Sequence, residues 1–369
     1  MITRDWGQST TAIHAGRPRP ETHPVGQQPF RSRWGDADLD ALAASLAALE
    51  KADRALVTSS GQSAYAVLFE TLLKRGSHLV VPAGLCPSTA RLLQHWVAHR
   101  GLKVTWIPNA LDLAAWERAI RDETVLLLAA SPANPTLAIT DLAGIAELGR
   151  RRGIRTVADN TFATPVFTRP LELGIDLSVA DANPFLGGHG DLAAGVIAGS
   201  EEAITACAAV ARLTESGADP MSAWLLQRGL KTLHLRMMRA ADNAQTLAAW
   251  LLWQPQVARV DFPGVKEHPG HAVAVRQMTG GFGAMLNFEL AGGLAAGQKF
   301  CGALEIIARE EHPGGLESLI QHPASQDQAR LPPDAKALGI SDGLLRLSVG
   351  IEDAADLKLD LERGFLAVG

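Results

Sequence analysis

Short apolar segments alternate with longer segments of helical periodicity from about residue 54 onward, and this alternation constrains the fold more than any other feature. The expected strands are 54–58, 78–82, 103–107, 125–129, 156–158 and 177–179, and the helices expected between them include 64–74, 90–100 and 142–152. Strands and helices that alternate in this way form a mostly parallel sheet with helices on both faces. We therefore predict an α/β fold.

The sequence pattern divides the chain into three parts. The first 35 residues are rich in proline, glycine, arginine and glutamine without a sustained period, so we expect an extended arm there. A helix is expected before the alternating region, at about 38–51. After that region we expect a long helical segment at 223–253, strands at 257–260, 284–288 and 344–348, and helices near 294–307 and 354–366. The predicted parts are an arm with the first helix (1–50), a large α/β domain (51–240) and a smaller α+β domain (241–369).

Composition and charge exclude several classes of protein. The net charge is −5, so there is no basic excess to neutralise the phosphates of a nucleic acid. The sequence has no long uncharged apolar segment and no signal-peptide stretch, so we expect a cytoplasmic protein without a membrane partner. Three scattered cysteines, Cys86, Cys207 and Cys301, are too few for a disulfide framework or a zinc site, and we expect no bound metal.

Seven peptides, in order along nearly the whole chain, resemble the Cys/Met-metabolism family of pyridoxal-phosphate (PLP) enzymes. They are residues 11–16, 59–64, 131–137, 159–165, 185–189, 314–320 and 345–353. This family includes cystathionine γ-synthase, cystathionine γ- and β-lyases and O-acylhomoserine sulfhydrylases. The resemblance implies a fold-type I architecture, with a mixed, mainly parallel sheet in the large domain and a smaller C-terminal α+β domain. It also implies a site shared between two subunits, and hence a homodimer or homotetramer.

The resemblance places Pro184 where the family has the lysine that holds PLP as a Schiff base. Proline has no amine that could form this imine. No lysine occurs between Lys103 and Lys231, so a shift of register does not supply one. We therefore expect no covalently bound PLP, and PLP itself is implied by the resemblance alone.

Other cofactor-handling positions also differ from the family. The hydroxyls that the family presents to the phosphate correspond to Asp181 and Asn183. A carboxylate at Asp181 would repel a phosphate dianion by about 1–4 kcal/mol. The tyrosine that stacks on the cofactor ring corresponds to Cys86, and the only tyrosine of the chain, Tyr65, lies at neither tyrosine position of the family.

Several positions keep the residue that the resemblance implies. Asp159 corresponds to the partner of the pyridinium nitrogen, although an aspartate at the end of a strand also commonly caps a turn. The other retained positions are Gly61 and Gln62 at a phosphate-capping turn, Asn134 beside the cofactor ring, and Arg346, which corresponds to the arginine that binds the substrate α-carboxylate.

The arginines and the candidate catalytic residues each have a plainer alternative. Arg346 could be a solvated or ion-paired strand residue, although its neighbours are apolar. Arg31 and Arg33 could be a solvated pair, whereas the resemblance makes Arg33 the phosphate ligand from the partner subunit. The catalytic residue stays unidentified, with Cys86 and His312 as weak candidates on position alone.

Three functions are compatible with this sequence. The first is a diverged homologue without Schiff-base chemistry, a pseudoenzyme or a PLP-independent enzyme, which binds an amino-acid-like or carboxylate ligand. The second is an active PLP-dependent lyase or synthase of sulfur amino-acid metabolism, acting on carbon–sulfur bonds. The third is a non-catalytic subunit that assembles with an active paralogue. Because Pro184, Asp181, Asn183 and Cys86 change together, we predict the first.

Overall fold

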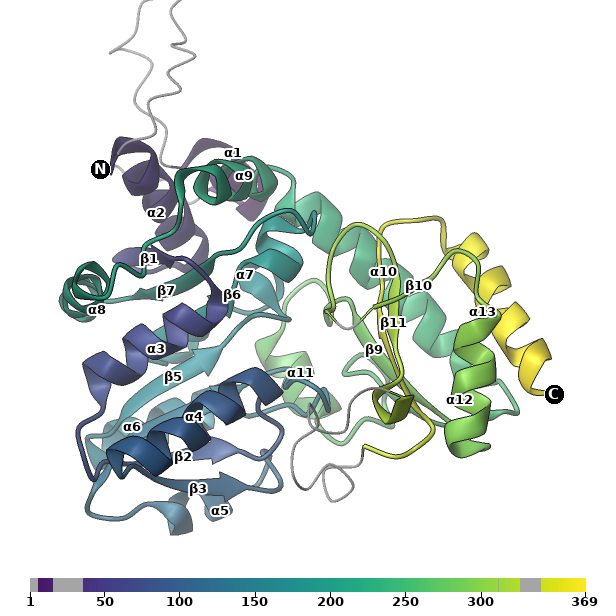
Figure 1. Cartoon of the computed structure of the whole chain (residues 1–369), viewed down its shortest axis with the longest axis horizontal. Helices are drawn as coiled ribbons and strands as arrows, with labels where there is room; N and C mark the ends of the chain where they lie inside the picture. The colour runs from purple at the N-terminus through teal and green to yellow at the C-terminus, as the bar shows by residue number, and fades with distance from the viewer. Residues whose placement is uncertain (1–5, 16–35, 311, 326–339) are drawn as a thin grey trace, which may run out of the picture.

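The computed structural model describes residues 6–15, 36–310, 312–325 and 340–369, which form two sheets with their helices (Figure 1). The larger sheet has the strand order β1-β7-β6-β5-β4-β2-β3. Its strands are Arg54–Thr58 (β1), His78–Pro82 (β2), Lys103–Ile107 (β3), Thr124–Ala130 (β4), Arg155–Asp159 (β5), Leu177–Asp181 (β6) and Gly195–Gly199 (β7). Strand β7 is antiparallel to both of its neighbours, β1 and β6, and the other neighbouring pairs of this sheet are parallel. The predicted α/β fold with a mixed, mainly parallel sheet is confirmed.

Helices cover both faces of the larger sheet, because alternate residues of each strand point to opposite faces. Leu79 and Val81 of β2 pack in the apolar core under α3, α4 and α8. Val80, between them, packs in the core under α5 and α6. These helices are Gly61–Leu72 (α3), Pro87–Arg100 (α4), Leu113–Ala119 (α5), Leu142–Arg152 (α6) and Glu201–Leu213 (α8).

Part of the predicted N-terminal arm is folded rather than extended. Residues Gln8–His14 form helix α1, in which Ala12 is buried, so the expectation of an unpacked segment is wrong for these residues. The Gln8 side chain donates hydrogen bonds of 3.0 Å to the carbonyl oxygens of Pro165 and Val166. These contacts, which no local periodicity signals, tie α1 to α7 (Thr164–Phe167). The following helix, α2, spans Asp36–Glu50.

The long helical segment predicted at 223–253 is two helices, α9 (Pro220–Leu230) and α10 (Leu233–Leu251). A turn separates them, in which the Thr232 N–H donates to the Gly229 carbonyl oxygen. Helix α10 lies between the two sheets in Figure 1 and contains residue 240, where the sequence predicts the domain boundary. That division of the chain into domains stays a prediction.

The smaller sheet has the order β10-β11-β12-β9-β8 and lies against α12 and α13 (Figure 1). Its strands are Val257–Asp261 (β8), Met285–Leu290 (β9), Ala308–Arg309 (β10), Leu319–Gln321 (β11) and Leu344–Ser348 (β12). The remaining elements are Pro170–Leu173 (η2), Asn183–Gly187 (η3), His271–Gln277 (α11), Gly293–Gly302 (α12), Pro323–Ser325 (η4) and Ala354–Val368 (α13). Phe288, Phe300 and Phe365 fill the core between sheet and helices.

The described ranges lack two features, a membrane-spanning helix and a metal-binding cluster. No helix there is long and apolar enough to cross a membrane. The same residues also contain no group of three or more histidine, cysteine or acidic side chains arranged to hold a metal ion.

Candidate functional site

A pocket of about 140 Å³ lies at the carboxyl ends of β4, β5 and β6, beside the first turn of α3. Residues near the carboxyl ends of parallel strands converge in this way, which is why such positions commonly hold ligands. The structure brings together here nine residues that the sequence singles out: Gly61, Gln62, Cys86, Asn134, Asp159, Asp181, Asn183, Pro184 and His312. Arg346 adjoins them, and Arg31 and Arg33 lie outside the described residues.

Pro184 lies in the short helix η3, directly after β6, and lines the pocket. Its carbonyl oxygen accepts a hydrogen bond from the Gly315 N–H at 2.9 Å. Gly314, at φ +100°, leaves no space for a Cβ, because such an atom would lie 2.4 Å from the Pro184 Cα. The backbone of the smaller sheet's loop therefore packs directly on the position where the resemblance implies a lysine. None of the lysines in the described ranges lines the pocket.

A buried arginine of α10 holds the η3 segment by hydrogen bonds to its backbone. Arg236, on α10, donates to the carbonyl oxygens of Phe185 at 2.9 Å and Leu186 at 3.1 Å, and also to that of Gly229. Burial lowers the pKa of Arg236 to about 10, which still leaves the guanidinium charged at neutral pH. The His189 Nδ1–H donates a local hydrogen bond of 2.6 Å to the Gly187 carbonyl oxygen, which supports a structural role for this histidine.

Both carboxylate oxygens of Asp159 already have donors. The Tyr65 hydroxyl donates to Oδ2 at 2.6 Å, and the Thr161 N–H donates to Oδ1 at 2.9 Å. Tyr65 is 4% exposed, and burial, followed by the Asp159 charge, raises the pKa of its phenol well above the ordinary value, so the phenol stays protonated. The Thr161 bond is the turn cap that we considered as the alternative role of Asp159.

The sequence prediction missed the role of Tyr65. The residue lies four positions after Gly61, one helical turn along α3, and therefore on the face of this helix that meets the pocket. That spacing could have indicated a contact with the site. The identity of its partner could not have been read locally, because Asp159 is 94 residues away.

Asp181 lies directly against the start of α3. A Cβ placed on Gly61 would lie 2.8 Å from the Asp181 Cβ and 2.9 Å from its Oδ2, so only glycine permits this approach. The other oxygen, Oδ1, accepts the Asn183 N–H at 2.9 Å. Burial raises the pKa of Asp181, the Asn183 hydrogen bond opposes the rise, and the Asp159 charge adds to it. A carboxylate of the chain therefore lies against the first residue of α3, beside the helix N-terminus that favours an anion.

Arg346, on β12, is a buried cation without an acidic partner among the described residues. It is 6% exposed, its Nη2 donates to the Asn134 Oδ1 at 2.8 Å, and its Nη1 donates to the Gln321 Oε1. Its Nε has no partner in the described structure, and burial lowers the pKa of Arg346 to about 10. The plainer alternative, a solvated or ion-paired strand arginine, does not hold among the described residues, because Arg346 is buried and both oxygens that it contacts belong to neutral amides.

Cys86 and His312 do not form a nucleophile–base pair. The Cys86 Sγ lies 3.1 Å from the Ser88 Oγ and accepts a weak bond from the Asn134 Nδ2 at 3.7 Å. His312 is exposed at the pocket, where its charge partly opposes the rise in the pKa of Asp181 that desolvation causes. No hydrogen bond joins Cys86 to a histidine within the part of the chain that the structure describes.

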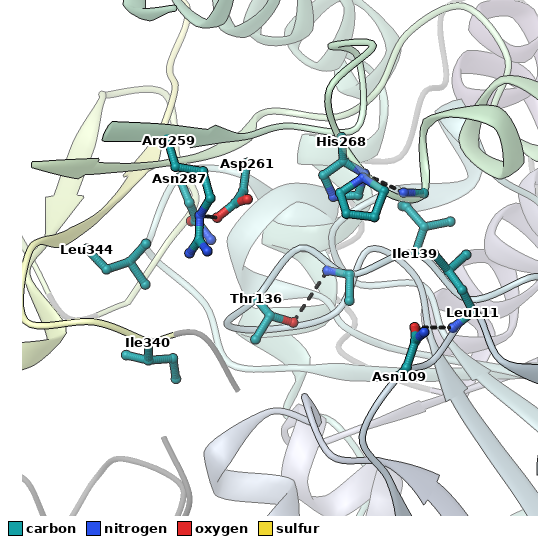
Figure 2. Close-up of a pocket in the computed structure, with 13 residues that line it drawn as sticks. Asn109, Leu111, Thr136, Ile139, Arg259, Asp261, His268, Asn287, Ile340 and Leu344 are labelled. Atoms are coloured by element: carbon teal, nitrogen blue, oxygen red, sulfur yellow. Dashed lines mark hydrogen bonds and ion pairs between the residues drawn. The ribbon is translucent and has the colours of Figure 1, made fainter. Parts of the chain in front are cut away.

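A second cavity, of about 200 Å³, is lined in part by Thr136 and Ile139, which follow Asn134 along the chain (Figure 2). Figure 2 shows Arg259 turned toward Asp261, which it contacts at 3.1 Å, and Arg259 also lies 3.5 Å from Glu289. The His268 Nδ1 accepts the Gly270 N–H, and burial lowers the pKa of His268 to about 4, so the ring is neutral. These groups have partners, and none of the residues that the sequence singles out lies here.

Comparisons with known proteins agree with the resemblance. The family model described as Cys/Met metabolism PLP-dependent enzyme matches residues 19–366. The L-methionine gamma-lyase of Pseudomonas putida is 40% identical over 341 residues, covering 92% of this chain and 85% of that protein. The cystathionine gamma-synthase of Mycobacterium tuberculosis is 37% identical, covering 97% and 96%. The solved cystathionine gamma-lyase of Lactobacillus plantarum, complexed with L-serine, superposes with a TM-score of 0.90 at 34% identity, covering 98% of this chain and 99% of that one.

Proposed function

The chain belongs to the Cys/Met metabolism PLP-dependent enzyme family, and we propose that its pocket binds a small amino-acid-like or carboxylate ligand without an imine between PLP and its own residue 184. The single observation that carries this proposal is that Arg346 is buried without an acidic partner among the described residues. A buried guanidinium without an acidic partner is costly, and removal of one partner from a buried ion pair typically costs about 3–5 kcal/mol. A ligand carboxylate would supply that partner through two parallel hydrogen bonds.

The opposite part of the pocket suits an ammonium group. Asp181 presents a carboxylate, and the Asn183 Oδ1 is buried without a donor in the described structure. His312 and Pro313 line both this pocket and the small hollow that contains Arg346, so the two ends adjoin. A zwitterion satisfies both ends. The L-serine in the similar cystathionine gamma-lyase structure is a ligand of this class.

The residues of the pocket do not fit covalently held PLP. Pro184 offers no amine, and both oxygens of Asp159 accept hydrogen bonds from the chain itself. The Asp181 carboxylate lies at the start of α3, where a phosphate dianion would meet a like charge. We therefore derive no catalytic step through PLP, and the absence of a covalent cofactor stays part of the proposal.

A PLP-dependent enzyme that cleaves or forms carbon–sulfur bonds is the second candidate. The 40% identity with an L-methionine gamma-lyase favours it. Incubation of the purified chain with PLP and L-methionine separates the two candidates, because thiol release is expected only from the second. Co-purification with a lysine-containing homologue would instead favour a non-catalytic subunit. The homodimer or homotetramer implied by the family also stays a proposal.

A thermal-shift screen of amino acids and small organic acids tests the proposed ligand. Binding to the native state raises the melting temperature. We expect at least one carboxylate to do so, and Arg346→Ala to weaken its binding at least about tenfold, equivalent to 1.4 kcal/mol. Arg239→Ala is the matched control, since Arg239 is an exposed arginine outside the pocket. A screen without any stabilising carboxylate, or an Arg346→Ala variant with unchanged affinity, contradicts the proposal.

A further inference from the structure

We propose that Tyr65 and Asp181 exclude pyridoxyl phosphates from this pocket, because they occupy the places that the family uses for the ring nitrogen and for the phosphate. The exclusion includes pyridoxyl phosphates that form no imine, so the missing lysine is not its cause. It rests on the proposed function only in that the pocket binds another class of ligand.

Tyr65 holds the Asp159 carboxylate against a ring nitrogen. Its hydroxyl donates to Oδ2 at 2.6 Å and the Thr161 N–H donates to Oδ1, so a ring nitrogen would have to share one of these oxygens with a donor of the chain. Displacement of the phenol from Asp159 would cost the buried hydroxyl a short, charge-assisted hydrogen bond, which destabilises the displaced state. The ring also packs on Phe69, with centroids 5.7 Å apart, inside the core under α3. Packing therefore holds the hydroxyl in place.

Asp181 holds the start of α3 against a phosphate. Its Cβ and Oδ2 lie so close to Gly61 that a methyl group there would overlap them. The Asn183 N–H fixes the other oxygen at 2.9 Å. A second constraint comes from the helix itself, since the Ser60 and Ser63 side chains form a reciprocal capping box and the Ser63 N–H is already bonded. A phosphate would have to displace a carboxylate and would meet its negative charge.

What stays open between Tyr65 and Asp181 is small. The pocket volume of about 140 Å³ is below the roughly 300–1,000 Å³ of typical small-molecule sites. Asn183, which also lines the pocket, has a buried Oδ1 without a donor in the described structure, and an ammonium group could donate to it. The geometry therefore selects a compact ligand with an ammonium group over an aromatic phosphate.

Pyridoxamine 5′-phosphate is the probe that tests this inference, because it has no aldehyde and needs no lysine. Its binding to the full chain is measured by calorimetry for the wild type, Asp181→Ser, Tyr65→Leu and the double variant. Inorganic phosphate is titrated separately to examine the start of α3 beside Asp181, and phosphate-free pyridoxamine to examine the Asp159 carboxylate beside Tyr65. Asp191→Ser is the matched control, since Asp191 is exposed and does not line the pocket.

We expect the wild type and Asp191→Ser to bind pyridoxamine 5′-phosphate at least tenfold more weakly than Asp181→Ser, and the double variant to bind it most tightly. Asp181→Ser should gain affinity for inorganic phosphate but not for pyridoxamine. Tyr65→Leu should gain affinity for pyridoxamine but not for inorganic phosphate. If Tyr65→Leu does not fold, the Asp181→Ser comparison decides the result.

Tight binding of pyridoxamine 5′-phosphate by the wild type, or no gain in Asp181→Ser, overturns the inference. Either result leaves the carboxylate screen and Arg346→Ala unaffected, so the failure of this inference is distinct from the failure of the proposed function.

Discussion

Glu50 makes the stability of this protein depend on pH in a way that one substitution can reveal. Glu50 ends α2 and is 2% exposed. Its Oε1 accepts a long bond of 3.5 Å from the Asn160 Nδ2, and its Oε2 has no partner in the described structure. Burial raises the pKa of Glu50 from 4.5 to about 7, and the Asn160 bond only partly opposes this.

The sign and size of the effect follow from these pKa values. Because the folded pKa lies above the unfolded one, the native state keeps a proton that the unfolded state has lost between pH 4.5 and about 7. The free energy of unfolding therefore falls as the pH rises through this window. The rise of the Glu50 pKa from 4.5 to about 7 corresponds to about 3 kcal/mol, since each unit of pKa is worth about 1.36 kcal/mol. Glu50→Gln removes the titration and keeps the shape of the side chain.

Urea denaturation at pH 5 and pH 8 measures the effect. We expect the stability of Glu50→Gln relative to the wild type to increase by about 3 kcal/mol from pH 5 to pH 8. Glu362→Gln, at an exposed glutamate of α13, is the control and should show no such change. A Glu50→Gln difference that is the same at both pH values would refute the reasoning.

Three further substitutions, at His268, Arg236 and Phe300, test the environment of buried side chains elsewhere in the fold. Burial lowers the pKa of His268 to about 4, so stability should fall by about 3 kcal/mol between pH 6.5 and pH 4, and His268→Gln should flatten this acid limb in denaturation curves. Arg236→Met should cost about 3 kcal/mol or more, since three carbonyl oxygens lose a buried donor, whereas Arg239→Met at an exposed ion pair should cost under about 1 kcal/mol. Phe300→Ala should cost about 3–5 kcal/mol by the same measurement; a loss under about 1 kcal/mol would contradict the packed aromatic core.

The sequence predicts the parallel strands well and the remaining elements less well, for physical reasons. Strands such as β2 are buried on both faces, so they are continuous apolar segments that a helix follows. Strand β7 went unpredicted, because it has glycine at both ends, Gly195 and Gly199, and glycine is depleted in strands. The helix predicted at 294–307 ends at Gly302, and the chain then turns into β10.

The candidate site was also only partly predictable from the sequence, because some of its contacts join residues that lie far apart in the chain. Spacing within the 181–189 peptide is local, so Asp181, Asn183 and Pro184 could be aligned with the family from sequence alone. The Tyr65–Asp159 bond joins residues 94 positions apart, and the missing partner of Arg346 depends on which side chains surround it after folding. Tertiary contacts of this kind leave no periodic signal.

Reaction of the full chain with PLP, followed by borohydride reduction and mass spectrometry, tests the central claim most directly. Reduction converts any imine into a stable phosphopyridoxyl adduct, which peptide mapping then assigns to a residue. Because Pro184 has no amine, we expect no stoichiometric adduct and no visible absorbance band of an enzyme-bound imine. A stoichiometric adduct on one lysine of the chain would contradict the account.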